Sequence, residues 1–319
     1  MYQNFRKHLQ QELEGIRNAG LYKTERIITS PQNAKIEVKG GKQVLNMCAN
    51  NYLGLADHPE VIKAAQEGTA KRGYGLSSVR FICGTQDIHK ELEQKISAFL
   101  GTEDTILYGS CFDANGGLFE TLLGPEDAII SDALNHASII DGIRLSTARC
   151  IRFRHNDLVQ LERLLEQHHA TFRQLIIVTE SIFSMDGDQA DLTALVRLKK
   201  RYSNVLLYVD EAHAFGVRGL RGLGCAEETG CIRDIDFLVG TFGKAAASAG
   251  AYIACCRMIR EYLVNRMRTF IFTTALPPTS IAWTLFIVRK LAGMQAHREH
   301  LARIGRALRE ALQAKGYGW

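Results

Sequence analysis

The feature that most constrains the fold is an alternation of short apolar runs and helical patterns from residue 104 onward. Strand-like runs lie at 105–108, 128–131, 150–153, 175–179, 205–209 and 237–239. Helical patterns near 113–123, 137–147, 157–168 and 191–202 separate most of these runs. Several runs are continuously apolar, which is typical of strands buried on both faces of a parallel sheet. The alternation therefore predicts an α/β fold with helices packed on a mostly parallel central sheet.

The flanking segments carry simpler signals. Phe5, Leu9, Leu13 and Ile16 recur at helical spacing and predict an N-terminal helix. Two short strand patterns around Gly40-Gly41 predict a hairpin. Further helices are expected near 60–72, 86–100, 256–268, 279–293 and 296–315, and no internal repeat or linker-like segment is visible.

Composition excludes several classes of protein. Of the 319 residues, 46% are hydrophobic and 23% are charged, which is ordinary for a soluble globular protein and excludes disorder. The net charge of +5 is too small and too scattered to indicate a nucleic-acid partner. The longest apolar stretches, 245–256 and 281–288, are too short to span a membrane. With no signal peptide, and no metal-ligand spacing among the eight cysteines, we expect a cytoplasmic protein without a bound metal.

Polar residues follow the apolar runs, at the sheet edge where open α/β folds bind ligands. Asp210 ends one run, Lys244 follows another in a Gly-flanked turn, and His136 follows a third. The segment 108–117 leads from a strand into a helix, whose free N–H groups can bind a phosphate. Each feature alone has a simpler interpretation. Asp210 could cap a helix or bind a metal, the lysine and histidine could be surface or structural residues, and many strand–helix turns look similar.

The order of these features is more specific than any one of them. Pyridoxal 5'-phosphate (PLP) needs N–H donors for its phosphate and a group stacked on its ring. It also needs a carboxylate beside its pyridine nitrogen and a lysine for its aldehyde. A phosphate turn, His136, Asp210 and Lys244 supply these needs at successive strand ends. The sequence therefore predicts a PLP site.

With these motifs, the chain resembles the α-oxoamine synthases over essentially its whole length. These are fold type I PLP-dependent enzymes that condense an amino acid with an acyl-CoA. The resemblance implies a three-layer α/β/α fold with a mostly parallel sheet. It implies that Lys244, His136, Asp210 and His213 are catalytic, with Lys244 bound covalently to PLP, His136 stacked on the ring and able to contact substrate, Asp210 at the pyridine nitrogen and His213 at the phenolic oxygen.

The resemblance also implies further binding residues. Cys111 and Phe112 would bind the phosphate through backbone amides, with a hydroxyl from Thr241, and Ser184 would contact the cofactor. Thr273 and Thr274 would reach the phosphate of a neighbouring subunit, which implies a homodimer with a shared site. Asn50 matches a position on the substrate side.

Two groups within the family are matched by different parts of the chain. Residues 1 to about 145 resemble the glycine C-acetyltransferases, for example in Ser110-Cys-Phe-Asp-Ala-Asn-Gly-Gly. From about 146 onward the chain looks more like the 8-amino-7-oxononanoate synthases, for example in Asp210-Glu-Ala-His-Ala. We therefore hypothesise a mosaic. Condensation of glycine with acetyl-CoA is the expected reaction, and condensation of alanine with a pimeloyl thioester is the alternative.

The family pattern also suggests a domain division. We expect an N-terminal segment over 1–45, a PLP-binding domain over 46–290 and the start of a further domain over 291–319. The family's C-terminal domain carries an arginine that binds the substrate carboxylate, and no matching segment is found here. We therefore expect the small C-terminal domain to be missing. This leaves open a third possibility, a truncated chain that binds PLP without activity.

Overall fold

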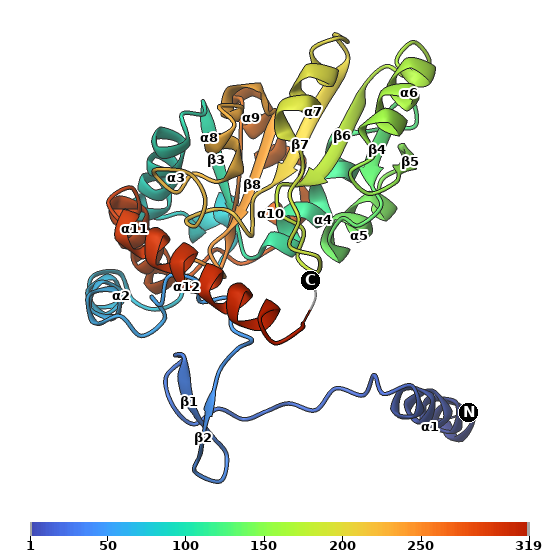
Figure 1. Cartoon of the computed structure of the whole chain (residues 1–319). Coiled ribbons are helices and arrows are strands. Elements are labelled where there is room, and N and C mark those ends of the chain that lie inside the picture. The colour runs from blue at the N-terminus through green and yellow to red at the C-terminus, as the bar shows by residue number, and fades with distance from the viewer. Residues whose placement is uncertain (1, 318–319) are drawn as a thin grey trace. The chain divides into compact units, whose positions relative to one another are not determined.

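The computed structural model describes residues 2–317 and divides the chain into two compact units, residues 1–48 and 49–319. In the first unit, α1 (Tyr2–Asn18) is followed by a hairpin of β1 (Lys35–Val38) and β2 (Lys42–Leu45), both labelled in Figure 1. The predicted N-terminal helix and hairpin are confirmed. The apolar stripe of α1, which includes Phe5 and Leu9, is exposed.

The second unit is built on one sheet, in which residues 49–317 supply seven strands. Their order is β3 (Asp104–Tyr108), β9 (Ala251–Cys255), β8 (Phe237–Thr241), β7 (Val205–Asp210), β6 (Leu175–Glu180), β4 (Ala128–Asp132) and β5 (Arg149–Phe153). β9 runs antiparallel to both of its neighbours, and the pairs from β8 to β5 are parallel. The mostly parallel sheet is therefore confirmed, and β9 is the strand that the sequence patterns missed.

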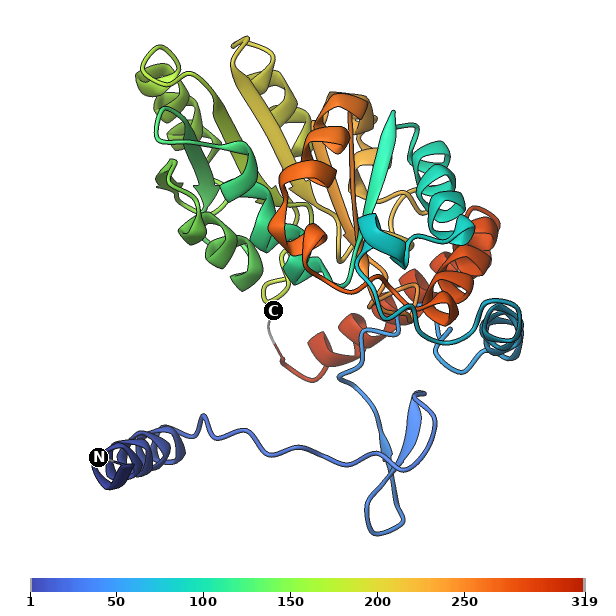
Figure 2. The ribbon, with the colours of Figure 1, turned by 180° about the vertical axis from the view of Figure 1, so that it is seen from behind.

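Helices cover both faces of this sheet, which makes the predicted three-layer α/β/α fold. One face packs on α4 (Cys111–Leu122), α5 (Ala137–Leu145), α9 (Arg257–Arg266) and α10 (Arg268–Ile271). The other face packs on α3 (Asp87–Leu100), α6 (Leu158–His168), α7 (Leu192–Lys199) and α11 (Pro278–Leu291). Figure 1 shows α6 and α7 in front of the sheet, and the reverse view in Figure 2 brings α9, in orange, to the front. Neighbouring strand residues such as Ile176 and Ile177 point to opposite faces and enter separate cores.

The other elements pack around these layers. α2 (Pro59–Arg72) lies so close to α11 that a Cβ at Gly68 would fall 2.4 Å from the Cβ of Ala282. The short elements are η1 (Arg80–Gly84), α8 (Cys225–Glu228) and η2 (Ile232–Asp234). The helix expected near 256–268 ends at Arg266, because Met267 adopts an extended backbone and separates α9 from α10. Within residues 2–317, no helix combines the length and the apolar character that crossing a bilayer requires.

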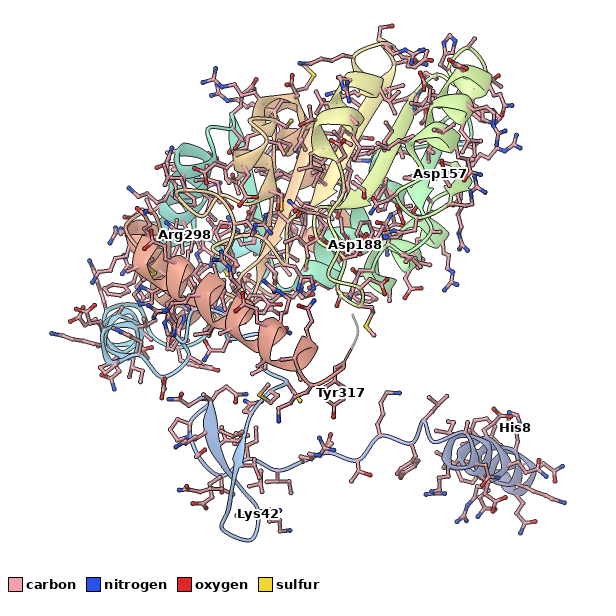
Figure 3. All side chains as sticks on the ribbon, in the orientation of Figure 1. His8, Lys42, Asp157, Asp188, Arg298 and Tyr317 are labelled. Carbon is pink, nitrogen blue, oxygen red and sulfur yellow. The ribbon has the colours of Figure 1, made fainter. Side chains whose placement is uncertain are left out.

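Helix α12 (Gln295–Gln313) closes the described chain and is anchored by the buried Arg298 (Figure 3). The Arg298 guanidinium donates to the carbonyls of Leu291 at 2.8 Å and Leu220 at 2.6 Å. These bonds join α12 to the rest of the second unit. The proposed limits at residues 45 and 290, and the assignment of α12 to a further domain, stay predictions.

Candidate active site

The predicted carboxylate and lysine lie at the ends of two adjacent strands. Asp210 is the last residue of β7, and Lys244 lies three residues beyond β8, which pairs with β7. The Asp210 side chain is buried, and its Oδ1 accepts a hydrogen bond of 2.8 Å from the backbone N–H of Ala212. Parallel strands end at the same edge of a sheet, so the fold itself brings these two side chains to one site.

Lys244 stands in a tight turn with its own supports. The Thr241 hydroxyl donates to the Gly250 carbonyl at 3.2 Å and accepts from the N–H of Gly243 at 3.2 Å. Ala247 completes the turn with a φ of +46°, a backbone conformation that costs free energy for a residue with a Cβ. Burial lowers the pKa of the half-buried Lys244 amine, against the opposing charge of Asp210. The turn therefore presents an amine that loses its proton more readily than a surface lysine.

The N-terminus of α4 forms the anion-binding part of the site. The Ser110 hydroxyl caps the helix by accepting from the N–H of Asp113 at 3.0 Å. The N–H groups of Cys111 and Phe112 lie in the first turn, where a helix offers them no acceptor of its own. The Cys111 sulfur lies 3.7 Å from Asp210 Oδ2, so this helix end adjoins the carboxylate. A phosphate bound here would meet free N–H donors and the positive end of the helix dipole.

The two predicted histidines differ in environment. His136 is exposed, and its Nδ1 lies 2.7 Å from the Ser138 hydroxyl at the start of α5. Burial and the nearby Lys244 charge lower the pKa of His213 to about 4, so its imidazole is neutral at neutral pH. His136 therefore offers an accessible ring face for stacking, and His213 offers a neutral hydrogen-bonding group beside the lysine.

Two residues beyond the sequence prediction complete this group. Tyr52 links two predicted residues, because its hydroxyl lies 2.8 Å from His213 Nδ1 and 3.1 Å from Asn50 Oδ1. Glu180, the last residue of β6, accepts from the backbone N–H of His136 at 2.6 Å. Burial and the Asp210 charge raise the pKa of Glu180 to about 8. Glu180 could have been predicted as a site residue, because it follows a strand-like run in the sequence. No sequence pattern indicated Tyr52.

The other predicted residues lie further from this centre or have local partners. Ser184 is exposed in the loop after β6. Thr273 and Thr274 line a small cavity with Gly109 and Arg80 of the same chain. Their contacts with a cofactor, and with a neighbouring subunit, stay predictions.

The loop that carries Ser184 is held by a histidine between two carboxylates. His155 Nδ1 lies 3.0 Å from Asp132 Oδ1, and its Nε2 lies 2.7 Å from Asp188 Oδ2. Figure 3 labels Asp188. Burial lowers the pKa of His155, but the two carboxylate hydrogen bonds outweigh burial and raise it above 6.5. Because both ring nitrogens face acceptors, the protonated imidazole is the form that satisfies both.

This geometry predicts a pH-dependent loss of stability for His155→Gln. The raised pKa in the folded state means that the stabilisation is fully present below about pH 6.5 and is lost as pH rises through the folded-state pKa. We expect the variant to lose about 2 kcal/mol of unfolding free energy at pH 6 and clearly less at pH 9. Urea denaturation of both proteins at the two pH values measures this, with the exposed His8 (Figure 3) replaced by Gln as a control. An equal loss of unfolding free energy at both pH values would contradict the inference that the His155 imidazole is protonated.

The donor set fits PLP in its chemistry and its arrangement. Helix N–H groups at Cys111 and Phe112 suit a phosphate, and the buried Asp210 suits a protonated ring nitrogen. The half-buried Lys244 suits an aldehyde, and the exposed ring of His136 suits stacking on an aromatic face. The fold and the site together define a PLP-dependent enzyme.

Comparison with known proteins identifies the family. The family model described as aminotransferase class I and II matches residues 42–319. The 2-amino-3-ketobutyrate coenzyme A ligase of Salmonella typhimurium is 49% identical over 316 residues, which cover 98% of this chain and 79% of that protein. The 8-amino-7-oxononanoate synthase of Geobacter sulfurreducens is 45% identical over 309 residues, covering 96% of this chain and 78% of that protein. The solved serine palmitoyltransferase of Sphingomonas wittichii has a TM-score of 0.91 at 33% identity and covers 97% and 77% of the two chains.

The chain therefore belongs to the class I and II aminotransferase family. Within that family it is an α-oxoamine synthase, an enzyme that depends on PLP. This confirms the resemblance drawn from the motifs. Both groups of relatives align on both sides of residue 145, and the mosaic origin of the chain stays a hypothesis.

Proposed function

We propose that this enzyme joins glycine to acetyl-CoA, giving 2-amino-3-oxobutyrate and CoA. In this reaction the α-carbon of glycine bonds to the acetyl carbonyl carbon and the thioester C–S bond breaks. The proton that leaves the α-carbon balances the CoA thiolate. The observation that carries the proposal is the placement of Lys244 and Asp210 at the ends of adjacent strands, in a chain 49% identical to a 2-amino-3-ketobutyrate coenzyme A ligase over nearly its whole length.

The side chains of the site have separate roles in this proposal. When bound, PLP supplies an aldehyde for the substrate amine and a ring that withdraws electrons from the α-carbon. Lys244 would hold the aldehyde between turnovers and would accept the α-proton, a role that its lowered pKa favours. Asp210 would hold a proton on the ring nitrogen. Cys111 and Phe112 would bind the phosphate through their N–H groups, and His136 would cover one face of the ring.

The remaining residues would orient the substrate and the ring. The neutral His213 would donate to or accept from the phenolic oxygen, and Tyr52 would connect it to Asn50 on the substrate side. Thr241 supports the lysine turn and would contribute its hydroxyl to the phosphate. Ser184 would contact the cofactor from the loop after β6.

A shared site in a homodimer belongs to the same proposal. Large apolar side chains stand exposed in the segments that surround the site, namely Phe81, Ile82, Phe112 and Phe272. A second copy of the chain would cover such a surface, with Thr273 and Thr274 directed to the partner's phosphate. All eight cysteines lie within residues 2–317 and are free thiols, which supports a reducing compartment, the cytoplasm.

Condensation of alanine with a pimeloyl thioester is the second candidate, because 8-amino-7-oxononanoate synthases are 43–49% identical to this chain. One assay separates the candidates. The protein is loaded with PLP and given glycine or alanine with each thioester, and thiol release is followed. We expect kcat/KM for glycine with acetyl-CoA to exceed the other pairs by about 10- to 200-fold, the range that one methyl group produces. Preference for alanine with the pimeloyl thioester would favour the second candidate. PLP binding without thiol release would indicate a binding protein.

A further inference from the structure

A buried amide connects the two groups that would contact the PLP ring from different sides. Asn115 of α4 is fully buried, and its Nδ2 donates to Asp210 Oδ2 at 3.0 Å and to the Ser138 hydroxyl at 2.9 Å. The Tyr208 hydroxyl donates to Asn115 Oδ1. Both protons of the amide and its oxygen are therefore paired inside the protein.

The directions of these bonds fix the position of a proton on His136. An ionised Asp210 only accepts, so the NH2 group of Asn115 must face it. That NH2 group also donates to Ser138, whose own hydroxyl proton is then free to go to His136 Nδ1, 2.7 Å away. The backbone N–H of Ser138 points at the same nitrogen from 3.2 Å. His136 Nδ1 is thus an acceptor, and the ring carries its proton on Nε2.

The fold supports this chain of bonds at each step. Tyr208 and Asp210 are two residues apart on β7, so both point to the face that α4 covers. Ser138 and Gly142 lie one turn apart on α5. A Cβ at Gly142 would fall 2.3 Å from the Asn115 carbonyl oxygen, so the glycine allows α5 to approach α4 closely enough for Ser138 to reach Asn115.

We propose that Asn115 is a positioning residue that couples Asp210 to His136. It holds the Asp210 carboxylate with one oxygen bonded to Asn115 and the other to Ala212, and through Ser138 it keeps His136 in the Nε2–H form. Oδ2 also accepts from the Cys111 thiol at 3.7 Å, whereas Oδ1, bonded to the Ala212 N–H, keeps a lone pair for the ring nitrogen. The inference rests on the roles of Asp210 and His136 given under Proposed function. It extends them to a residue with no direct contact with the cofactor.

Asn115→Leu tests the coupling, since leucine has similar volume and no hydrogen-bonding group. We expect the PLP dissociation constant, measured by titration of the cofactor-free protein, to rise at least about tenfold, as for loss of a hydrogen bond to a charged group. We also expect histidine-directed ¹⁵N NMR to show a larger share of the Nδ1–H form of His136 in Asn115→Leu than in the wild type, because the Ser138 hydroxyl is then able to accept from the ring as well as donate to it. The His136 signals are assigned from their absence in His136→Asn.

Ser138→Ala provides a second test, because it cuts only the link to His136. We expect it to raise the Nδ1–H share of His136, because the hydroxyl bond at 2.7 Å is lost and the longer backbone bond at 3.2 Å remains. We expect the PLP dissociation constant to stay within about threefold of the wild type, because the charged bond to Asp210 remains. If Asn115→Leu fails to fold, Ser138→Ala alone tests the coupling. In that case an unchanged His136 tautomer in Ser138→Ala overturns the proposal.

Asn204→Leu is the matched control. Asn204 Nδ2 also donates inside the protein, to the carbonyls of His169, Phe172 and Arg173, but Asn204 precedes β7 at the opposite end from Asp210. We expect it to lower the unfolding midpoint and leave PLP binding and the His136 signals unchanged. Wild-type PLP binding and tautomer in a folded Asn115→Leu would overturn this inference alone. Failure of the wild type to bind PLP would overturn the proposed function together with it.

Discussion

Lys244→Ala is expected to lower glycine-dependent CoA release by about 10³- to 10⁴-fold, the largest effect of any single substitution in this chain. Under the proposed function, the variant would lose both the amine that holds PLP covalently and the base that accepts the α-proton. The turn that carries Lys244 is supported by Thr241, Gly243 and Gly250 rather than by the lysine side chain. The loss is therefore chemical, and the unfolding midpoint should stay within a few degrees of the wild type.

Two measurements check this result. Borohydride reduction followed by peptide mass analysis should leave the cofactor's mass on the Lys244 peptide of the wild type and on no peptide of the variant. Lys290→Ala is the matched control, since Lys290 pairs with Glu60 on the surface of α11 and α2. It should retain both the labelling of Lys244 and the rate. Labelling of another lysine in the wild type would show that Lys244 is not the covalent site.

The strands flanking this site were predictable because of their burial. β4, β6 and β7 are covered on both faces, so their sequences are apolar over most of their length and stand out between helical patterns. β9 was not recognised as a strand. It lies in the small-residue stretch 245–256, which has no alternation, and its antiparallel place between β3 and β8 is set by tertiary pairing.

The site was predictable to the extent that its residues follow strands. Asp210, Lys244 and His136 were predicted because each follows a strand-like run within five residues. Asn115, Ser138 and Tyr208 were not, because a polar residue inside a helix or strand looks the same whether its side chain meets solvent or a buried partner. Their coupling depends on the close approach of α4 and α5 at Gly142, which no local pattern encodes.

Asp210→Asn is expected to lower kcat by about 10²- to 10³-fold, the size of effect that follows loss of one preorganised electrostatic group. Asp210 is buried at the end of β7, so in the proposed role its carboxylate would stabilise a positive ring nitrogen that has little access to water. The asparagine side chain at position 210 would also face two donors, because the Ala212 N–H and Asn115 Nδ2 both point at this position. Asparagine can accept with one atom only, so we also expect weaker PLP binding.

Asp236→Asn separates this effect from general damage to the β7–β8 pair. Asp236 accepts from the Leu207 N–H at 2.7 Å and pairs with Lys199 at 2.6 Å, at the end of β8 opposite Lys244. The control should lose stability in urea and keep its kcat, whereas Asp210→Asn should lose kcat. Asp210→Glu, which restores the carboxylate one methylene further out, should recover part of the rate. If Asp210→Asn turned over at the wild-type rate, the ring-nitrogen role of Asp210 would be wrong, and so would the coupling through Asn115 that depends on it.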